Sequence, residues 1–114
     1  MVEFKQSGLD LIFHALSDST RRSILRTVSQ KEATVGEIAK LYPMSLNAVS
    51  KHLKVLDAAS LIKRERRGSF QIVRLNPDKL WPAQEWLAYY EQFWTRRMDA
   101  LQTYLEGENN DDIG

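Results

Sequence analysis

Hydrogen-bonding and cationic side chains are concentrated between residues 45 and 75 of this chain, in the segment SLNAVSKHLKVLDAASLIKRERRGSFQIVRL. The segment holds seven lysines and arginines against two acids, Asp57 and Glu65. Amide and hydroxyl groups can exchange hydrogen bonds with base edges, whereas ammonium and guanidinium groups pair with phosphates. The chemistry on offer is therefore non-covalent recognition of a polyanion.

The first half of this segment predicts a helix over residues 45–59, with Ser45 as its N-cap. Val49, Leu53 and Leu56 fall at i, i+4 and i+7, so one face of the helix is apolar and packs inward. The N-terminal end of such a helix is the part that enters a DNA major groove. The residues expected to contact bases or phosphates are Ser45, Leu46, Asn47, Ala48, Ser50, Lys51 and Lys54.

Individual contacts follow from side-chain chemistry. Asn47 can make a bidentate contact with adenine, and Leu46 or Ala48 can pack on a thymine methyl group. Taken alone, Asn47 is equally compatible with a solvated helix residue, and Lys54 with an ordinary surface charge. The functional interpretation therefore depends on what lies beside the helix.

A basic hairpin follows, with strands expected at 62–67 and 70–75 and a turn at Gly68. Loops of Gly68–Ser69 or Arg67–Gly68 are both possible, and a one-residue slip exchanges the two faces. A capped helix followed by a basic hairpin is typical of a winged helix-turn-helix, in which the hairpin, or wing, contacts backbone or minor groove. The wing contacts are assigned to Arg64, Arg66, Arg67, Ser69 and Gln71.

Composition excludes several other functions. The chain has 114 residues, a net charge of +1 and no cysteine, which removes disulfides, thiolate zinc sites and cysteine catalysis. No nucleophile elbow, phosphate loop or metal motif surrounds its Ser, His and Asp residues, so we expect neither an enzyme nor a cofactor. No apolar run approaches about 18 residues, which indicates a soluble protein with no membrane partner.

Further helices are expected at 9–16, at 20–29, after Thr34 and at about 82–106. Thr34 and Glu37 have the spacing of a capping box, and Pro43 ends the short third helix. The domain is expected to span residues 1–106, with Gly107 ending the last helix and a disordered acidic tail over 107–114.

The last helix carries more aromatic residues than one small domain can bury, including all three tryptophans between residues 81 and 94. Aromatic side chains are favoured at interface centres, and a two-fold dimer is the commonest way to cover such a face. An aromatic-lined pocket for a small-molecule inducer is the alternative. The expected dimer interface comprises Leu9, Ile12, Phe13, Trp86, Tyr90, Phe93, Trp94 and Leu101.

The run HALSDSTRRSILRTV, followed by TVGEIAKLYPMSLNAVSKHLKVLDAASLIKRERRGSFQIVRLNP, resembles the ArsR/SmtB family of bacterial transcriptional regulators over about residues 9–77. The resemblance implies a mainly α fold with five helices and a two-stranded wing. It also implies a cytoplasmic homodimer, built from the first and last helices, that represses its own operon and leaves double-stranded DNA when an inducer binds. It places Asp18, Thr20 and Arg21 at the junction after the first helix, where Arg21 or Arg22 would contact phosphate or form an intramolecular ion pair.

The chain departs from the metal-sensing members of that family. Thr34-Val35-Gly36 stands in place of their Cys-x-Cys pair, and the last helix has no histidine. We therefore expect no metal site. The two histidines, His14 and His52, lack the partners that zinc needs, and His52 is expected to be a packing or hydrogen-bonding residue. A winged helix that binds an acidic protein partner instead of DNA is the competing interpretation.

Overall fold

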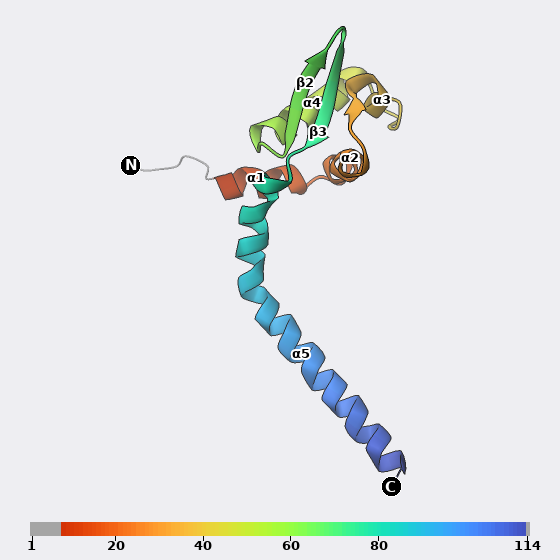
Figure 1. The fold of residues 1–114 in the computed structure, drawn as a ribbon, viewed down its shortest axis with the longest axis vertical. Helices are drawn as coiled ribbons and strands as arrows, with labels where there is room; N and C mark the ends of the chain where they lie inside the picture. Colours follow the sequence, from red (N-terminus) through yellow and green to blue (C-terminus); the bar gives the residue numbers. More distant parts are fainter. Residues whose placement is uncertain (1–7, 114) are drawn as a thin grey trace, which may run out of the picture. The chain divides into compact units, whose positions relative to one another are not determined.

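The computed structural model describes the backbone of residues 8–113 and the side chains of residues 8–107. The chain divides into two units, the first ending at Ala83 and the second beginning at Gln84. The elements, in chain order, are α1 (Gly8–Leu16), α2 (Ser19–Gln30), β1 (Ala33–Thr34), α3 (Val35–Ala39), α4 (Leu46–Ala58), β2 (Ile62–Arg67), β3 (Phe70–Leu75), the 3-10 helix η1 (Pro77–Leu80) and α5 (Trp81–Ile113) (Figure 1).

The core of the first unit lies where α2, α3 and α4 meet the sheet. Each helix buries one stripe, as the apolar spacing predicts, and the stripe of α4 is fully buried. Burying a side chain of this size contributes about 1.5–3 kcal/mol, so this packing holds α4 from behind. The largest fully buried side chains are Ile24, Ile38, Val49, Leu53, Leu56, Leu61 and Val73.

The wing is confirmed, and its register is now resolved. Arg67 pairs with Phe70, so Gly68 and Ser69 form the two-residue loop, with Gly68 at a φ of +62° that favours glycine. The sheet has three strands in the order β1-β3-β2, because Ala33 and Thr34 pair with β3. The expected two-stranded wing was therefore one strand short, since two residues are too few to show a strand's alternation.

The connection from α4 to β2 is a Schellman motif. The amide of Leu61 donates to the carbonyl of Leu56 at 3.0 Å, and the amide of Ser60 donates to the carbonyl of Asp57 at 2.8 Å. Ser60 has a φ of +60°, which glycine normally occupies at this position. Leu56 and Leu61 are both fully buried, so this turn fixes the exit of α4 against the core.

The last helix is longer than expected. It begins one residue before Pro82 and continues to Ile113, so the predicted end at Gly107 is wrong. A disordered tail from 107 conflicts with this helical backbone, while Gly114 lies outside the described residues. One exposed glycine costs about 1 kcal/mol relative to alanine, and no proline follows it to stop the helix.

Candidate nucleic-acid interface

The N-terminal end of α4 has the two faces that its sequence predicts. Ser45 caps the helix, its hydroxyl accepting from the amide of Ala48 at 3.1 Å. Ala48 and Ser50 are half-buried at the edge of the buried stripe. Ser45 itself and the remaining predicted residues of this helix are exposed, namely Leu46, Asn47, Lys51 and Lys54. An amide and two ammonium groups thus project from a helix whose other side is fixed in the core.

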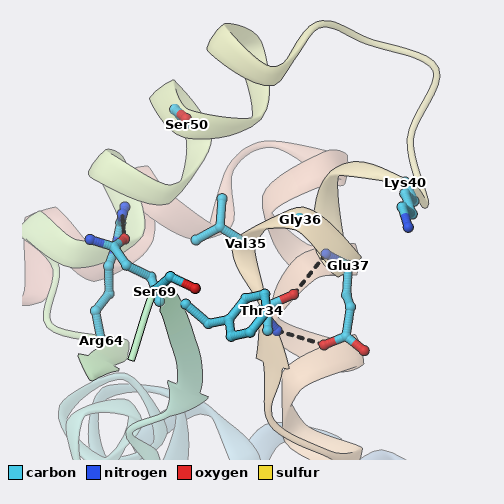
Figure 2. Close-up of a pocket in the computed structure, with 10 residues that line it drawn as sticks. Thr34, Val35, Gly36, Glu37, Lys40, Ser50, Arg64 and Ser69 are labelled. Carbon is cyan, nitrogen blue, oxygen red and sulfur yellow. Dashed lines mark hydrogen bonds between the residues drawn. The ribbon is translucent and has the colours of Figure 1, made fainter. Parts of the chain in front are cut away.

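A groove of about 690 Å³ joins α4 to the wing (Figure 2). Four of the residues predicted to bind DNA line it: Ser50 from α4, Arg64 from β2, Ser69 from the turn and Gln71 from β3. The structure therefore brings together residues from both halves of the predicted interface. Its remaining lining comes from the end of β1, from α3 and the residue that follows it, and from β3, namely Thr34, Val35, Gly36, Glu37, Lys40 and Phe70.

Lys40 and Phe70 also line this groove, and neither was among the predicted site residues. Phe70 is 62% exposed at the start of β3, and Lys40 follows the last residue of α3. A large exposed aromatic beside a glycine turn is a signal that could have been noticed. Lys40 carries no local signal, because only the packing of α3 against the sheet brings it to the groove.

The wing arginines are not equivalent. The Nε atom of Arg64 lies 2.8 Å from the carboxylate of Asp57 on α4, and its Nη1 donates to Gln71 at 3.2 Å. Arg67 pairs with the carboxylates of Glu32 and Glu65. Among the described residues, Arg66 is the one wing arginine with no carboxylate partner within salt-bridge distance; its Nε meets the carbonyl of Gly68 at 3.4 Å.

These ion pairs affect the acids involved. The hydrogen bond and charge of Arg67 hold the pKa of Glu65 below its ordinary 4.5, and Arg74 adds a further charge 3.1 Å away. Burial raises the pKa of Asp57 above its ordinary 3.8, and the charge of Arg64 opposes that rise without cancelling it. The guanidinium groups of Arg64 and Arg67 thus have protein partners before any nucleic acid is present.

Arg21 does not offer a phosphate contact. Its side chain is 9% exposed, and it donates to the carbonyls of Ala15 at 2.8 Å and His14 at 2.9 Å. The predicted alternative, an ion pair, is replaced by these bonds to the last carbonyls of α1, which a helix end leaves without partners. Arg22 is exposed and donates to the carbonyl of Leu16 at 2.8 Å.

His52 is a hydrogen-bonding residue, as predicted. It is half-buried on α4, and its Nδ1 lies 3.4 Å from Nη1 of Arg21 and 3.8 Å from Oδ2 of Asp18. Asp18 caps α2 by accepting from the amide of Arg21 at 3.0 Å, and this bond lowers the pKa of its carboxyl below 3.8.

Comparison with known proteins agrees with this geometry. A family model described as a helix-turn-helix domain matches residues 16–65. The HTH-type transcriptional regulator Rv2034 of Mycobacterium tuberculosis is 34% identical over 102 residues, which cover 90% of this chain and 92% of that protein. The transcriptional repressor SdpR of Bacillus subtilis is 36% identical over 76 residues, covering 67% of this chain and 84% of that protein.

Solved structures give the same result. The crystal structure of an ArsR family transcriptional regulator is 31% identical, with a TM-score of 0.71 over 81% of this chain and 97% of that one. This chain belongs to the ArsR family of transcriptional regulators. A second similar structure is a homodimeric winged helix-turn-helix DNA-binding domain from Mycobacterium bovis, at 26% identity and a TM-score of 0.60, covering 75% of this chain and 82% of that one.

In this ArsR-family regulator the start of α3 does not fit a metal. The Thr34 hydroxyl accepts from the amide of Glu37 at 3.0 Å, and the Glu37 carboxylate accepts from the amide of Thr34 at 2.8 Å (Figure 2). The predicted capping box is thus confirmed, and Thr34-Val35-Gly36 offers no thiolate or imidazole where the metal-sensing members carry their cysteines. Within residues 8–107, no three His, Cys, Asp or Glu side chains are grouped to hold a metal ion.

The predicted dimer residues differ in how far they are exposed. Ile12 is 3% exposed because it lies in this chain's own core, so its assignment to a dimer interface is wrong. Helical spacing alone cannot distinguish a face that packs into the core from a face that packs against a second subunit. Leu9 and Phe13 are partly buried against that core. The residues on α5 are all exposed large side chains, namely Trp86, Tyr90, Phe93, Trp94 and Leu101.

The exposed aromatic residues of α5 also contact one another. The ring centroids of Trp86 and Tyr90 are 4.8 Å apart, and those of Tyr89 and Tyr90 are 4.9 Å apart. The rings therefore form a continuous apolar surface along the helix. No helix in the described part of the chain is both long and apolar enough to cross a membrane.

Proposed function

We propose that this regulator is a homodimeric, sequence-specific repressor of its own operon, acting in the bacterial cytoplasm. It reads a two-fold operator in double-stranded DNA, with α4 in the major groove and the wing on the neighbouring backbone or minor groove. The observation that carries the proposal is the exposed amide and ammonium face of α4 beside a groove that residues of the wing complete. The similarity to the transcriptional repressor SdpR supports it, as does the way in which helix-turn-helix proteins place a helix in the major groove.

The DNA contacts are assigned to those predicted residues that are not already paired with a carboxylate in the described part of the chain. The DNA-facing set is Ser45, Leu46, Asn47, Ala48, Ser50, Lys51, Lys54, Arg66, Ser69 and Gln71. Arg64 and Arg67 are placed in a different role, since each already has a carboxylate partner, and they fix the shape of the wing. A lysine or arginine that must first leave an acid contributes less to phosphate binding than a free one.

The dimer part of the proposal rests on α5. Its exposed aromatic surface is the kind of face that interfaces bury, and the similar structure from Mycobacterium bovis is homodimeric. A dimer also presents two recognition helices to half-sites about one DNA turn apart. A small-molecule inducer, if the protein has one, would find an aromatic lining on the same helix.

Selection of bound fragments from random DNA tests the proposal directly. The expected result is a two-fold motif with half-sites separated by a whole number of helical turns. Enrichment of no motif, with only weak and salt-sensitive binding, would instead indicate a module that binds an acidic protein partner.

Sedimentation of a Trp94→Glu variant tests the dimer. Trp94 is 57% exposed on the aromatic face, so the new charge should yield monomers. Thr95→Glu is the matched control, because the next residue points about 100° away around the helix and should leave the dimer intact. An intact dimer for both variants would place the interface elsewhere.

A further inference from the structure

Polar contacts hold α4 on both sides of its buried stripe. At about 100° per residue, Asp57 and His52 project to opposite sides of the line through Val49 and Leu53. On one side Asp57 pairs with Arg64 of the wing at 2.8 Å. On the other side His52 meets Arg21 at 3.4 Å. The apolar stripe sets how deeply the helix packs, whereas contacts at its two edges limit its rotation.

The Arg21 side chain is itself held in place. Its Nε and Nη2 atoms donate to carbonyls at the end of α1, and Nη2 also lies 3.5 Å from the hydroxyl of Ser17. The remaining nitrogen, Nη1, is the one that faces His52. A buried guanidinium therefore connects the end of α1, the first turn of α2 and the middle of α4.

The chemistry of the pair assigns the roles of the two nitrogens. A guanidinium has only donors, so in this contact the Nδ1 atom of His52 is the acceptor. Protonation would place a hydrogen on Nδ1 and abolish this acceptor. The carboxylate of Asp18, 3.8 Å from the same nitrogen, would then be the available partner. Among the described residues, the charged groups that contact the ring are thus Asp18 and Arg21.

We propose that Arg21 and His52 are positioning residues for DNA recognition: neutral His52 accepts from Arg21 and so fixes the rotation of α4 about its axis. The direction in which Asn47, Lys51 and Lys54 project depends on that rotation. Protonation of His52 replaces its contact with Arg21 by a contact with Asp18. Specific binding then weakens because α4 is no longer held in the same rotation, although no side chain that contacts DNA is removed. The inference rests on the proposed function of α4 as the reading helix.

Two substitutions of His52 separate positioning from folding. His52→Asn keeps an acceptor close to the position of Nδ1 but does not titrate, and His52→Leu removes the acceptor. Affinity for the selected operator and for random DNA is measured by fluorescence anisotropy at about pH 8 and about pH 5.5, on either side of the ordinary histidine pKa. Stoichiometric titration gives the active fraction, so that loss of folded protein does not count as loss of affinity.

At the higher pH, His52→Leu should bind the operator about a hundredfold more weakly, because each of the two α4 helices in the dimer loses about 1.4 kcal/mol, or about tenfold, close to the lower limit for one hydrogen bond to a charged group. Random-DNA affinity should fall clearly less than operator affinity, since the wing and its phosphate contacts are unchanged. The wild-type protein should lose operator affinity at the lower pH, and His52→Asn should not. His14→Asn, the matched control, should keep the wild-type pH response.

Wild-type operator affinity in His52→Leu would overturn the inference, as would equal losses on operator and random DNA. A His52→Asn variant with the wild-type pH response would overturn it too. A wild-type protein that prefers no sequence would instead refute the proposed function.

Discussion

The wing arginines provide a quantitative test, because the structure separates two neighbours that look alike in the sequence. Arg66 is exposed and meets no carboxylate in the part of the chain that the structure describes, whereas Arg67 is paired with Glu32 and Glu65. Each phosphate contact that is lost reduces the slope of log affinity against log salt by about 0.9. A dimer has two wings, so Arg66→Ala should reduce the slope by about 1.8.

This slope translates into a measurable ratio. Between 50 and 200 mM salt, the affinity ratio of wild type to Arg66→Ala should shrink by about tenfold, because a fourfold salt change is raised to a power of about 1.8. The loss should be the same on operator and on random DNA, since a phosphate contact carries no sequence information. Fluorescence anisotropy across a salt series measures both quantities, and the thermal midpoint should stay essentially unchanged.

Arg67→Ala is the control. Its guanidinium is already neutralised by two carboxylates, so its removal should change the slope clearly less than that of Arg66. Equal slope changes for the two variants would show that pairing in the free protein does not decide which arginine meets phosphate. An unchanged slope for Arg66→Ala would remove the wing from the interface.

Three further predictions concern the reading helix, its exit and the capping box. Asn47→Ala should cost about 1–3 kcal/mol of discrimination at one base position per half-site, with random-DNA affinity unchanged in competition assays; equal losses on both DNAs would remove Asn47 from the reading set. Ser60→Gly should raise the free energy of unfolding by about 1 kcal/mol, because it relieves the positive φ, and urea melts should show a higher midpoint with the same slope; a lower midpoint would contradict this reasoning. The hydrogen bond from the amide of Thr34 holds the pKa of Glu37 below its ordinary 4.5, so the stabilisation is present above that pH and is lost as the pH falls through the lowered value. Glu37→Gln keeps the acceptor without titrating, so its stability should fall less than that of the wild type between about pH 5 and pH 3; parallel declines would refute this assignment.

Local signals were enough to predict most of the elements. The strands 62–67 and 70–75 occur at the predicted bounds, since a glycine turn between two strand-forming runs identifies a hairpin from neighbouring residues alone. The cap at Ser45 and the capping box at Thr34 are likewise set within four residues. The buried stripe of α4 is also a local signal, since its three members lie within eight residues.

The parts that could not be predicted depend on residues far apart in the chain. Arg67 is neutralised by Glu32, which is 35 positions away, and no spacing rule connects them. Ile12 has the same periodicity whether its partners are in its own domain or in a second copy, and only the packed core decides. The contact between Arg21 and His52 was hidden for the same reason, because the two residues are 31 positions apart.

The short strand β1 links the wing to the remainder of the DNA-binding surface. Ala33 and Thr34 pair with β3, and the very next residue begins α3. The hairpin is therefore not a free arm, because tilting it would pull on the first helix of the helix-turn-helix. Under the proposed function, α4 and the wing reach two adjacent grooves at a distance that the protein sets. A DNA site whose groove spacing differs must then deform to be bound, and sites that deform easily gain an advantage at bases that no side chain touches.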